Sequence, residues 1–254
     1  MSIFEKKKIV LEIQTDRLYR VAQTYFPDIT LSDSYIWDKV RAAERQVEQD
    51  LRVYLEPVVV LPEVTPQEER DALDAAGTRW IEEPGYDWHP EFFQGNKWGF
   101  IGTRARPIIS VDYLKFVYPI AGNTIFEVPD QWIRLDKKYG QIRLLPAGTL
   151  VSAPLNSYIM SVMGGGLTVP HILMLRYTVG IKDAFDEYPN VVDAIKKLAV
   201  LKIIEDEFLP SSSSISADGL SENISIDTDK YEEKIERIID NARDEIHGIR
   251  MIAL

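Results

Sequence analysis

The sequence predicts an α+β protein in which an antiparallel β region is inserted into a helical core. In the first and last parts of the chain, apolar residues recur at intervals of three and four, which is the period of an amphipathic helix. Between about residues 100 and 180 the period changes to two, and β-branched and aromatic residues become frequent, as in strands. Helices, then strands, then helices is an element order typical of the α+β class.

The clearest helix is expected in the first part of the chain, over about residues 33–55. Ser32 or Asp33 can cap its start, and Pro57 can stop it. Residues 1–26 are ambiguous, because KIVLEI fits a strand whereas DRLYRVAQTYF has helical spacing. The apolar face of the long helix includes Ile36, Val40, Val47 and Leu51.

A short helix is expected to follow the long one. Thr65, with Pro66 at the first helical position and Glu68 three residues after Thr65, has the pattern of a capping box, and Gly77 suits the far end. Residues 79–100 are rich in tryptophan, proline and glycine, so we expect an irregular segment that covers a core or a neighbouring subunit.

Five short segments between residues 107 and 179 have the composition of strands. Two of them, WIRLD and QIRLL, are separated by KKYG, in which Gly140 can adopt the left-handed conformation of a hairpin loop. The hairpin would place four apolar side chains on one face: Ile133, Leu135, Ile142 and Leu144. The other three segments are PIISVDYLKFVY, TIFEV and ILMLRYTV.

Helical spacing returns after Gly180. One helix is expected over residues 191–208, with Pro210 at its end, and a last helix begins at Asp227 or Thr228 as its cap. A polar stretch with a serine tract, residues 211–227, separates the two helices. These patterns predict three parts: residues 1–99, 100–180 and 181–254.

Composition excludes several classes of function. The chain has 254 residues, a formal net charge of −11 and no cysteine. Because no basic stripe is available for a phosphate backbone, sequence-specific DNA binding is not expected. The absence of cysteine excludes disulfides and thiolate chemistry, which fits a protein made in a reducing cytoplasm. The apolar run near the N-terminus is too short for a signal peptide or a membrane span.

No catalytic, metal or cofactor site is predicted. The three histidines lie in different segments without a second ligand at metal-binding spacing, and the glycine run lacks the residues of a phosphate loop. The carboxylates after residue 217 do not match a calcium loop. The residues considered are His89, His171, His247, Ser157, Gly164, Gly165, Gly166, Asp218, Asp227 and Asp229.

One acidic and aromatic stretch leaves an alternative open. Glu82, Glu83 and Asp87 lie next to Trp80, Tyr86 and Trp88, and paired carboxylates beside aromatic rings are what a glycoside hydrolase requires. The stretch therefore permits a carbohydrate-acting enzyme, or a carbohydrate- or receptor-binding β module without chemistry. Adjacent acids in a loop rich in proline and glycine are more often simply solvated.

Four stretches, in this order, resemble the head-to-tail connector (adaptor) proteins of tailed bacteriophages. The resemblance lies in a helix with alanines and charges, an RPIISV strand opening, a strand that ends in Y-T-x-G, and a helix that begins at a proline. The stretches begin at residues 32, 106, 170 and 214, and together they cover most of residues 31–251. The chain departs from compact connectors by the segment 57–100 between its long helix and its strands.

The resemblance implies a non-enzymatic ring subunit, commonly a dodecamer, in the neck of a virion. Such a ring docks under the portal protein, binds the next neck or tail protein, and lets genomic DNA pass through its channel without reading the DNA sequence. On this basis we expect subunit contacts on the long helix, at Ile36, Val40, Val47 and Leu51. Portal contacts are expected near the C-terminus, at Ile246, His247, Ile249, Arg250, Met251 and Ile252.

Overall fold

The computed structural model describes residues 2–89, 99–118, 123–145, 168–208 and 228–247. The chain forms two compact units: residues 1–55 together with 183–254, and residues 56–182. The first unit is helical and the second carries the strands, so the predicted α+β class with an inserted β region is confirmed. The boundaries differ from those of the three expected parts. Strands within residues 56–89 join the sheet of the second unit, so this segment does not belong to the helical part.

The ambiguous N-terminal segment is helical. Helix α1 spans Lys6–Thr15 and helix α2 spans Arg17–Tyr25. In α1 the apolar residues Ile9, Val10 and Ile13 are buried at helical spacing. The carboxylate of Asp16 accepts a hydrogen bond from the backbone N–H of Leu18 at 2.8 Å, which caps α2 and separates it from α1.

Helix α3 spans Asp33–Leu51, shorter than the expected 33–55. Ser32 caps its start by accepting a hydrogen bond from the N–H of Tyr35, as predicted. The expected stop at Pro57 is wrong, because Arg52 already adopts a left-handed conformation with a φ of 55°. The N–H of Arg52 then bonds to carbonyls of the last turn, and this closes the helix before the proline is reached.

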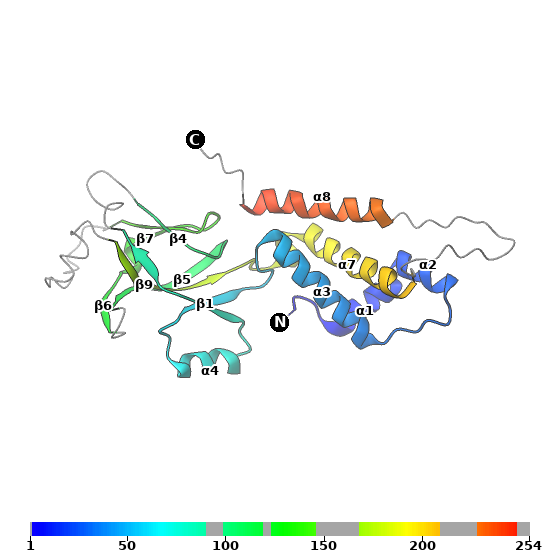
Figure 1. Cartoon of the computed structure of the whole chain (residues 1–254), viewed down its shortest axis with the longest axis horizontal. Helices are drawn as coiled ribbons and strands as arrows, with labels where there is room; N and C mark the ends of the chain where they lie inside the picture. The colour runs from blue at the N-terminus through cyan, green and yellow to red at the C-terminus, as the bar shows by residue number, and fades with distance from the viewer. Residues whose placement is uncertain (1, 90–98, 119–122, 146–167, 209–227, 248–254) are drawn as a thin grey trace. The chain divides into compact units, whose positions relative to one another are not determined.

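The helical unit is completed from the other end of the chain. Helix α6 spans Ala184–Glu187, α7 spans Pro189–Ile203 and continues as a π-helical turn, η3, over Ile204–Phe208, and α8 spans Thr228–His247. Helix α7 packs on α3 and on α8 (Figure 1). The predicted end at Pro210 and the cap residue Asp227 lie outside the described residues.

The larger sheet of the second unit is built around strand β9, Val169–Val179, in the order β2-β1-β9-β5-β6. Strand β5, Ile108–Val117, is antiparallel to one edge of β9, and β6, Thr124–Glu127, follows β5 as a hairpin. The other edge of β9 pairs with β1, Val58–Pro62, at one end and with β3, Tyr86–Trp88, at the other. Strand β2, Trp80–Glu83, lies parallel to β1, so the sheet is not entirely antiparallel.

Two local predictions for residues 57–100 are wrong. The part of residues 79–100 that the structure describes is not irregular, since it contains β2 and β3. Helix α4 spans Gln67–Ala75 without the expected capping box, because the Thr65 hydroxyl donates instead to the carbonyl of Pro62. The far end of α4 is as predicted: Gly77 has a φ of 67°, and the N–H groups of Gly77 and Thr78 bond to carbonyls of the last turn.

The predicted hairpin is confirmed. Strand β7, Ile133–Asp136, follows the short 3₁₀ turn η2, Asp130–Trp132, and pairs with β8, Gln141–Leu144. The two-residue strand β4, Ile101–Gly102, pairs with the other edge of β8. Cross-strand pairing of Ile133 with Leu144 and of Leu135 with Ile142 places these four side chains on one face.

We expect Gly140→Ala to destabilise this hairpin. Gly140 has a φ of 64°, and an added Cβ would lie 2.5 Å from the hydroxyl oxygen of Thr103. The left-handed conformation alone costs a residue with a side chain about 1–2 kcal/mol, so the free energy of unfolding in urea should fall by at least this amount. Gly102→Ala is the control, since its Cβ would meet only Phe100 at 3.9 Å. Equal stability of the two variants would contradict the prediction.

Candidate functional site

The three carboxylates singled out in the acidic and aromatic stretch have separate partners. Glu82 forms an ion pair with Arg70 at 2.8 Å. Asp87 accepts a hydrogen bond from the backbone N–H of His171 at 2.9 Å, where His171 has a φ of 53°. Glu83 is buried, with 7% of its surface exposed. The stretch therefore holds two carboxylates engaged in structural contacts and one buried carboxylate.

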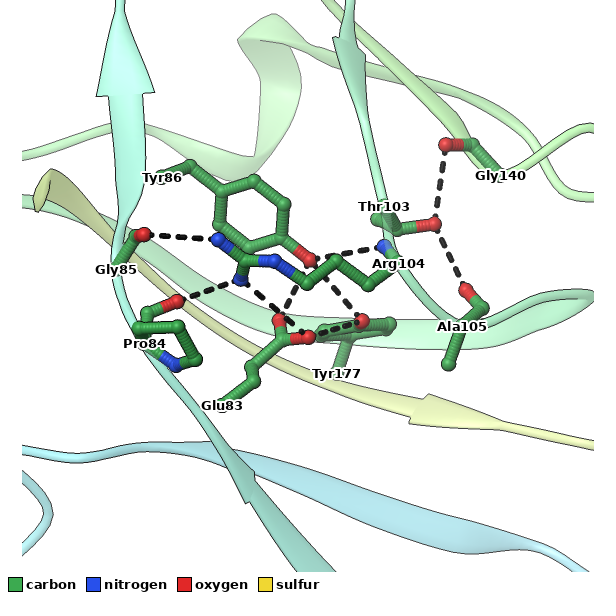
Figure 2. A network of polar contacts seen from close by, with 9 residues as sticks. All are labelled: Glu83, Pro84, Gly85, Tyr86, Thr103, Arg104, Ala105, Gly140 and Tyr177. Carbon is green, nitrogen blue, oxygen red and sulfur yellow. Dashed lines mark hydrogen bonds and ion pairs between the residues drawn. The ribbon is translucent and has the colours of Figure 1, made fainter.

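The carboxylate of Glu83 binds two tyrosine hydroxyls. The hydroxyl of Tyr86 donates to Oε1 at 2.6 Å, and the hydroxyl of Tyr177 donates to Oε2 at 3.1 Å (Figure 2). The two hydroxyl oxygens are 3.2 Å apart. Because Glu83 ends β2, Tyr86 begins β3 and Tyr177 lies in β9, this group ties three strands together.

Arg104 closes the network from the segment between β4 and β5. Its guanidinium donates to the carbonyl of Pro84 at 2.6 Å and to that of Gly85 at 3.1 Å, and it lies 3.7 Å from Oε2 of Glu83. The same guanidinium stacks on the ring of Tyr86, 4.2 Å from the ring centre. The turn between β2 and β3 is thus held by charge-assisted hydrogen bonds (Figure 2).

Thr103 extends these contacts to the hairpin. Its hydroxyl lies 2.8 Å from the carbonyl of Ala105 and 3.0 Å from that of Gly140, and its N–H donates to Gly140 (Figure 2). The turn of β7 and β8 is therefore anchored next to the Glu83 network.

Burial dominates the electrostatics of the network. Burial raises the pKa of Glu83 above its ordinary value of 4.5, and the Tyr86 hydrogen bond and the charge of Arg104 offset only part of that increase. Burial also raises the pKa of Tyr86 and of Tyr177 well above the ordinary range, and the charge of Glu83 adds to this increase. Both tyrosines are therefore neutral donors at neutral pH. The arrangement serves to join strands, and it supplies no activated nucleophile.

Sequence reasoning missed Tyr177 and Arg104. Both are distant in sequence from Glu83, and only the pairing of β9 within the sheet brings Tyr177 to the carboxylate. The available signal was the Y-T-x-G end of β9, which contains Tyr177.

Glu83→Gln should remove a pH dependence of stability. Because the pKa of Glu83 is raised in the folded state, its contribution to stability is fully present below about pH 4.5 and is lost as the pH rises through the raised pKa. The free energy of unfolding in urea, measured between about pH 4 and pH 7, should therefore decline less with pH in Glu83→Gln than in the unmodified chain. Glu82→Gln, in the same strand, is the matched control and should follow the unmodified chain. Parallel curves for all three proteins would contradict the assignment.

The histidines and the remaining candidate ligands do not form a metal site in the described part of the chain. No group of three histidine, cysteine, aspartate or glutamate side chains that could hold a metal ion is found there. His89 bonds through Nδ1 to the hydroxyl of Thr168 at 2.9 Å, and His247 bonds to a backbone carbonyl. Ser157, Gly164, Gly165, Gly166, Asp218 and Asp227 lie outside the described residues, as does the side chain of Asp229.

The residues expected to contact other subunits lie in the core of the helical unit. Ile36, Val40, Val47 and Leu51 each have 0% of their surface exposed. Their stripe on α3 is covered within the protomer, so only other side chains of α3 are available to a second copy.

The residues expected to contact the portal divide into two groups. Ile246 is buried within the helical unit, and Nε2 of His247 donates to the carbonyl of Leu51 at 2.6 Å. Arg243, one turn earlier on α8, donates through Nε to the carbonyl of Asp50 at 2.9 Å. These two side chains therefore bind carbonyls at the C-terminal end of α3, where a helix leaves such groups without partners. Ile249, Arg250, Met251 and Ile252 lie outside the described residues.

A groove of about 390 Å³ lies where α8 meets α3 and α7. Its apolar lining comes from Leu198, Ile235 and Ile239. Its polar lining is Gln46, Asp50, Glu232, Glu236, Asp240 and Arg243. Four carboxylates against one guanidinium make this groove acidic.

We expect His247→Leu to weaken the attachment of α8 to α3. The leucine removes the donor to the Leu51 carbonyl, and an acceptor left without a partner at a partly buried site costs about 1 kcal/mol or more. His247→Gln retains a donor and should lose less. Hydrogen exchange of the last turn of α3 and urea unfolding measure the effect. Equal behaviour of the two variants would show that the hydrogen bond does not hold α8.

Comparisons with known proteins give no family assignment. No protein-family model matches the chain, and no curated protein matches its sequence. Within the part that the structure describes, no helix is both long and apolar enough to cross a membrane.

Solved structures show similarity at a low level, as two of them illustrate. A chain from a structure described as the virion of a native gene transfer agent (GTA) particle is 13% identical, with a TM-score of 0.43, over 95% of this chain and 94% of that chain. A chain from a structure described as the neck of an empty GTA particle computed with C6 symmetry is 14% identical, with a TM-score of 0.42, over 89% of this chain and 83% of that chain. Likeness at this level assigns no function to the present chain.

Proposed function

We propose that this chain is a structural head-to-tail connector (adaptor) subunit of a tailed, phage-like particle. Copies form a ring in the neck that docks under the portal protein, binds the next neck or tail protein and continues the channel for DNA. The subunit is made in the host cytoplasm and acts without enzymatic chemistry. The ring is a homo-oligomer, and a dodecamer is the copy number that the sequence resemblance implies.

The observation that carries the proposal is where the four connector-like stretches fall in the fold. They supply α3, the strands β5 to β8, the β9–α7 segment, and α8. These include the central pairing of β5 with β9 and the packing of α7 with α3 and α8. The pairing of β5 with β9 and the packing of α3 with α7 are the most extensive contacts in the described part of the chain, so the resemblance falls on the centre of each unit, as expected of a shared framework.

The departure from compact connectors leaves this framework intact. Residues 57–89 form β1, α4, β2 and β3, which are added to the free edge of β9. Arg176 of β9 forms ion pairs with Asp112 of β5 and with Glu69 of α4, so the addition is fastened to the sheet. It therefore extends the sheet without interrupting the pairing of β5 with β9.

Charge and chemistry are consistent with the proposal. With a net charge of −11 and no basic stripe, the subunit can line a channel through which DNA passes without adhering. The alternative of a carbohydrate-acting enzyme would need Glu82, Glu83 and Asp87 to be free for substrate, whereas each is held by the protein's own groups. No observation favours the alternative of a carbohydrate- or receptor-binding module.

Electron microscopy of the purified protein, alone and mixed with portal rings, tests the proposal. We expect closed rings, or portals capped on one face. We also propose that Ile249, Arg250, Met251 and Ile252 contact the portal, so a chain ending at His247 should lose portal capping. The structural reason is that α8 ends at His247, and the truncation therefore leaves the bonds of Arg243 and His247 to α3 in place.

Thermal unfolding of the truncated chain is the control, and its midpoint should match that of the full chain. A truncated protein that still caps portals would overturn the contact assignment. A full-length chain that neither forms rings nor caps portals would overturn the proposed function.

A further inference from the structure

The acidic groove on α8 contains an arrangement of charges that is unfavourable in an isolated protomer. Glu232, Glu236 and Asp240 follow one another at intervals of four residues, so like charges adjoin along one face of the helix. Asp50 of α3 adds a fourth carboxylate. The one guanidinium in the groove, that of Arg243, is already bound by Asp240 at 2.9 Å and by the Asp50 carbonyl. The groove therefore retains an excess of negative charge around an apolar floor.

Helix α1 has the reverse problem, because positive charges gather where the helix dipole disfavours them. Lys6, Lys7 and Lys8 occupy its first turn, where the positive end of the helix dipole disfavours cations, and the turn contains no acidic residue. All three lysines are exposed, and the described part of the chain gives them no ion pair. Leu11, three and four residues after Lys8 and Lys7, is 62% exposed. This basic face, Lys7, Lys8 and Leu11, combines cations with one apolar side chain.

The basic face and the acidic groove belong to helices that lie on opposite sides of the pair α3 and α7. Helices α1 and α8 each pack on both α3 and α7, and Figure 1 draws α1 and α8 on either side of that pair. The two surfaces therefore cannot satisfy one another within one protomer. Two copies of the chain placed head to tail can bring them together.

We propose that the basic face of α1 in one copy docks into the acidic groove of α8 and α3 in the next copy. Lys7 and Lys8 meet the carboxylates of the rim, and Leu11 meets the apolar floor. Because the two surfaces differ, the contact is heterologous and repeats from copy to copy, which produces a ring when the rotation closes. The closure into a ring rests on the proposed function, whereas the pairing of the two surfaces does not.

Charge reversal on α1 provides the first test, in the full-length chain. Lys7→Glu combined with Lys8→Glu should weaken self-association at least about tenfold, measured by sedimentation velocity at low salt, because attraction becomes repulsion. The same change places acids at the positive end of the helix dipole, which offsets the repulsion between position 8 and Glu12, so the thermal stability of the protomer should change little. Weaker association without lower stability separates a contact role from a folding role.

Charge reversal in the groove provides the second test. Glu232→Lys combined with Glu236→Lys should also weaken self-association. An equal mixture of the two double variants should restore it, because each reversed face then meets a reversed groove. All four substitutions in one chain should restore it as well. Lys137→Glu with Lys138→Glu, two exposed lysines in the β7–β8 turn, is the matched control for net charge and should associate normally.

Three outcomes would overturn the inference: normal association of either double variant, failure of the mixture to restore association, or an unmodified chain that stays a monomer as far as its solubility allows. None of them decides the proposed function, which is tested separately by capping of portal rings. A chain that caps portals while its variants associate normally would keep the connector role and lose this contact.

Discussion

Strand β9 is the constraint on which the β unit depends. It is paired on both edges, with β5 along one side and with β1 and β3 along the other. Strands β2 and β6 join the sheet only through β1 and β5. Because β9 lies at the centre of the sheet, most of its apolar side chains are buried: Ile172, Leu173, Met174, Leu175, Tyr177 and Val179. β9 also brings Tyr177 to Glu83, so the polar network depends on the same strand.

Sequence reasoning succeeded where structure is set by neighbours in the chain. The hairpin of β7 and β8 follows from alternation and one glycine, and the start of α3 from one serine. It failed where long-range pairing decides, as for β2 and β3, whose tryptophans and intervening Pro84 and Gly85 have the composition of a loop. Thr65 illustrates a second limit, because its hydroxyl had two possible acceptors and the sequence does not rank them.

The candidate sites show that an apolar or acidic pattern does not reveal whether a side chain is buried in its own protomer or available to a partner. The stripe of Ile36, Val40, Val47 and Leu51 has the same spacing whether it faces the protomer's own core or another subunit, and the packing of α7 decides for the core. Glu83 was identified as a carboxylate among aromatic residues, but its burial depends on β9. The charges of α1 and α8 carry more information, because the lysines of α1 oppose the helix dipole and the neighbouring carboxylates of α8 repel one another.

The first and last residues of the β unit are far apart in the sequence but lie next to each other in space. Antiparallel pairing holds Val58, at its entry, opposite Val179, near its exit. Because the ends of the insertion meet, a short linker could replace the whole segment 56–182 without changing the path of the helices.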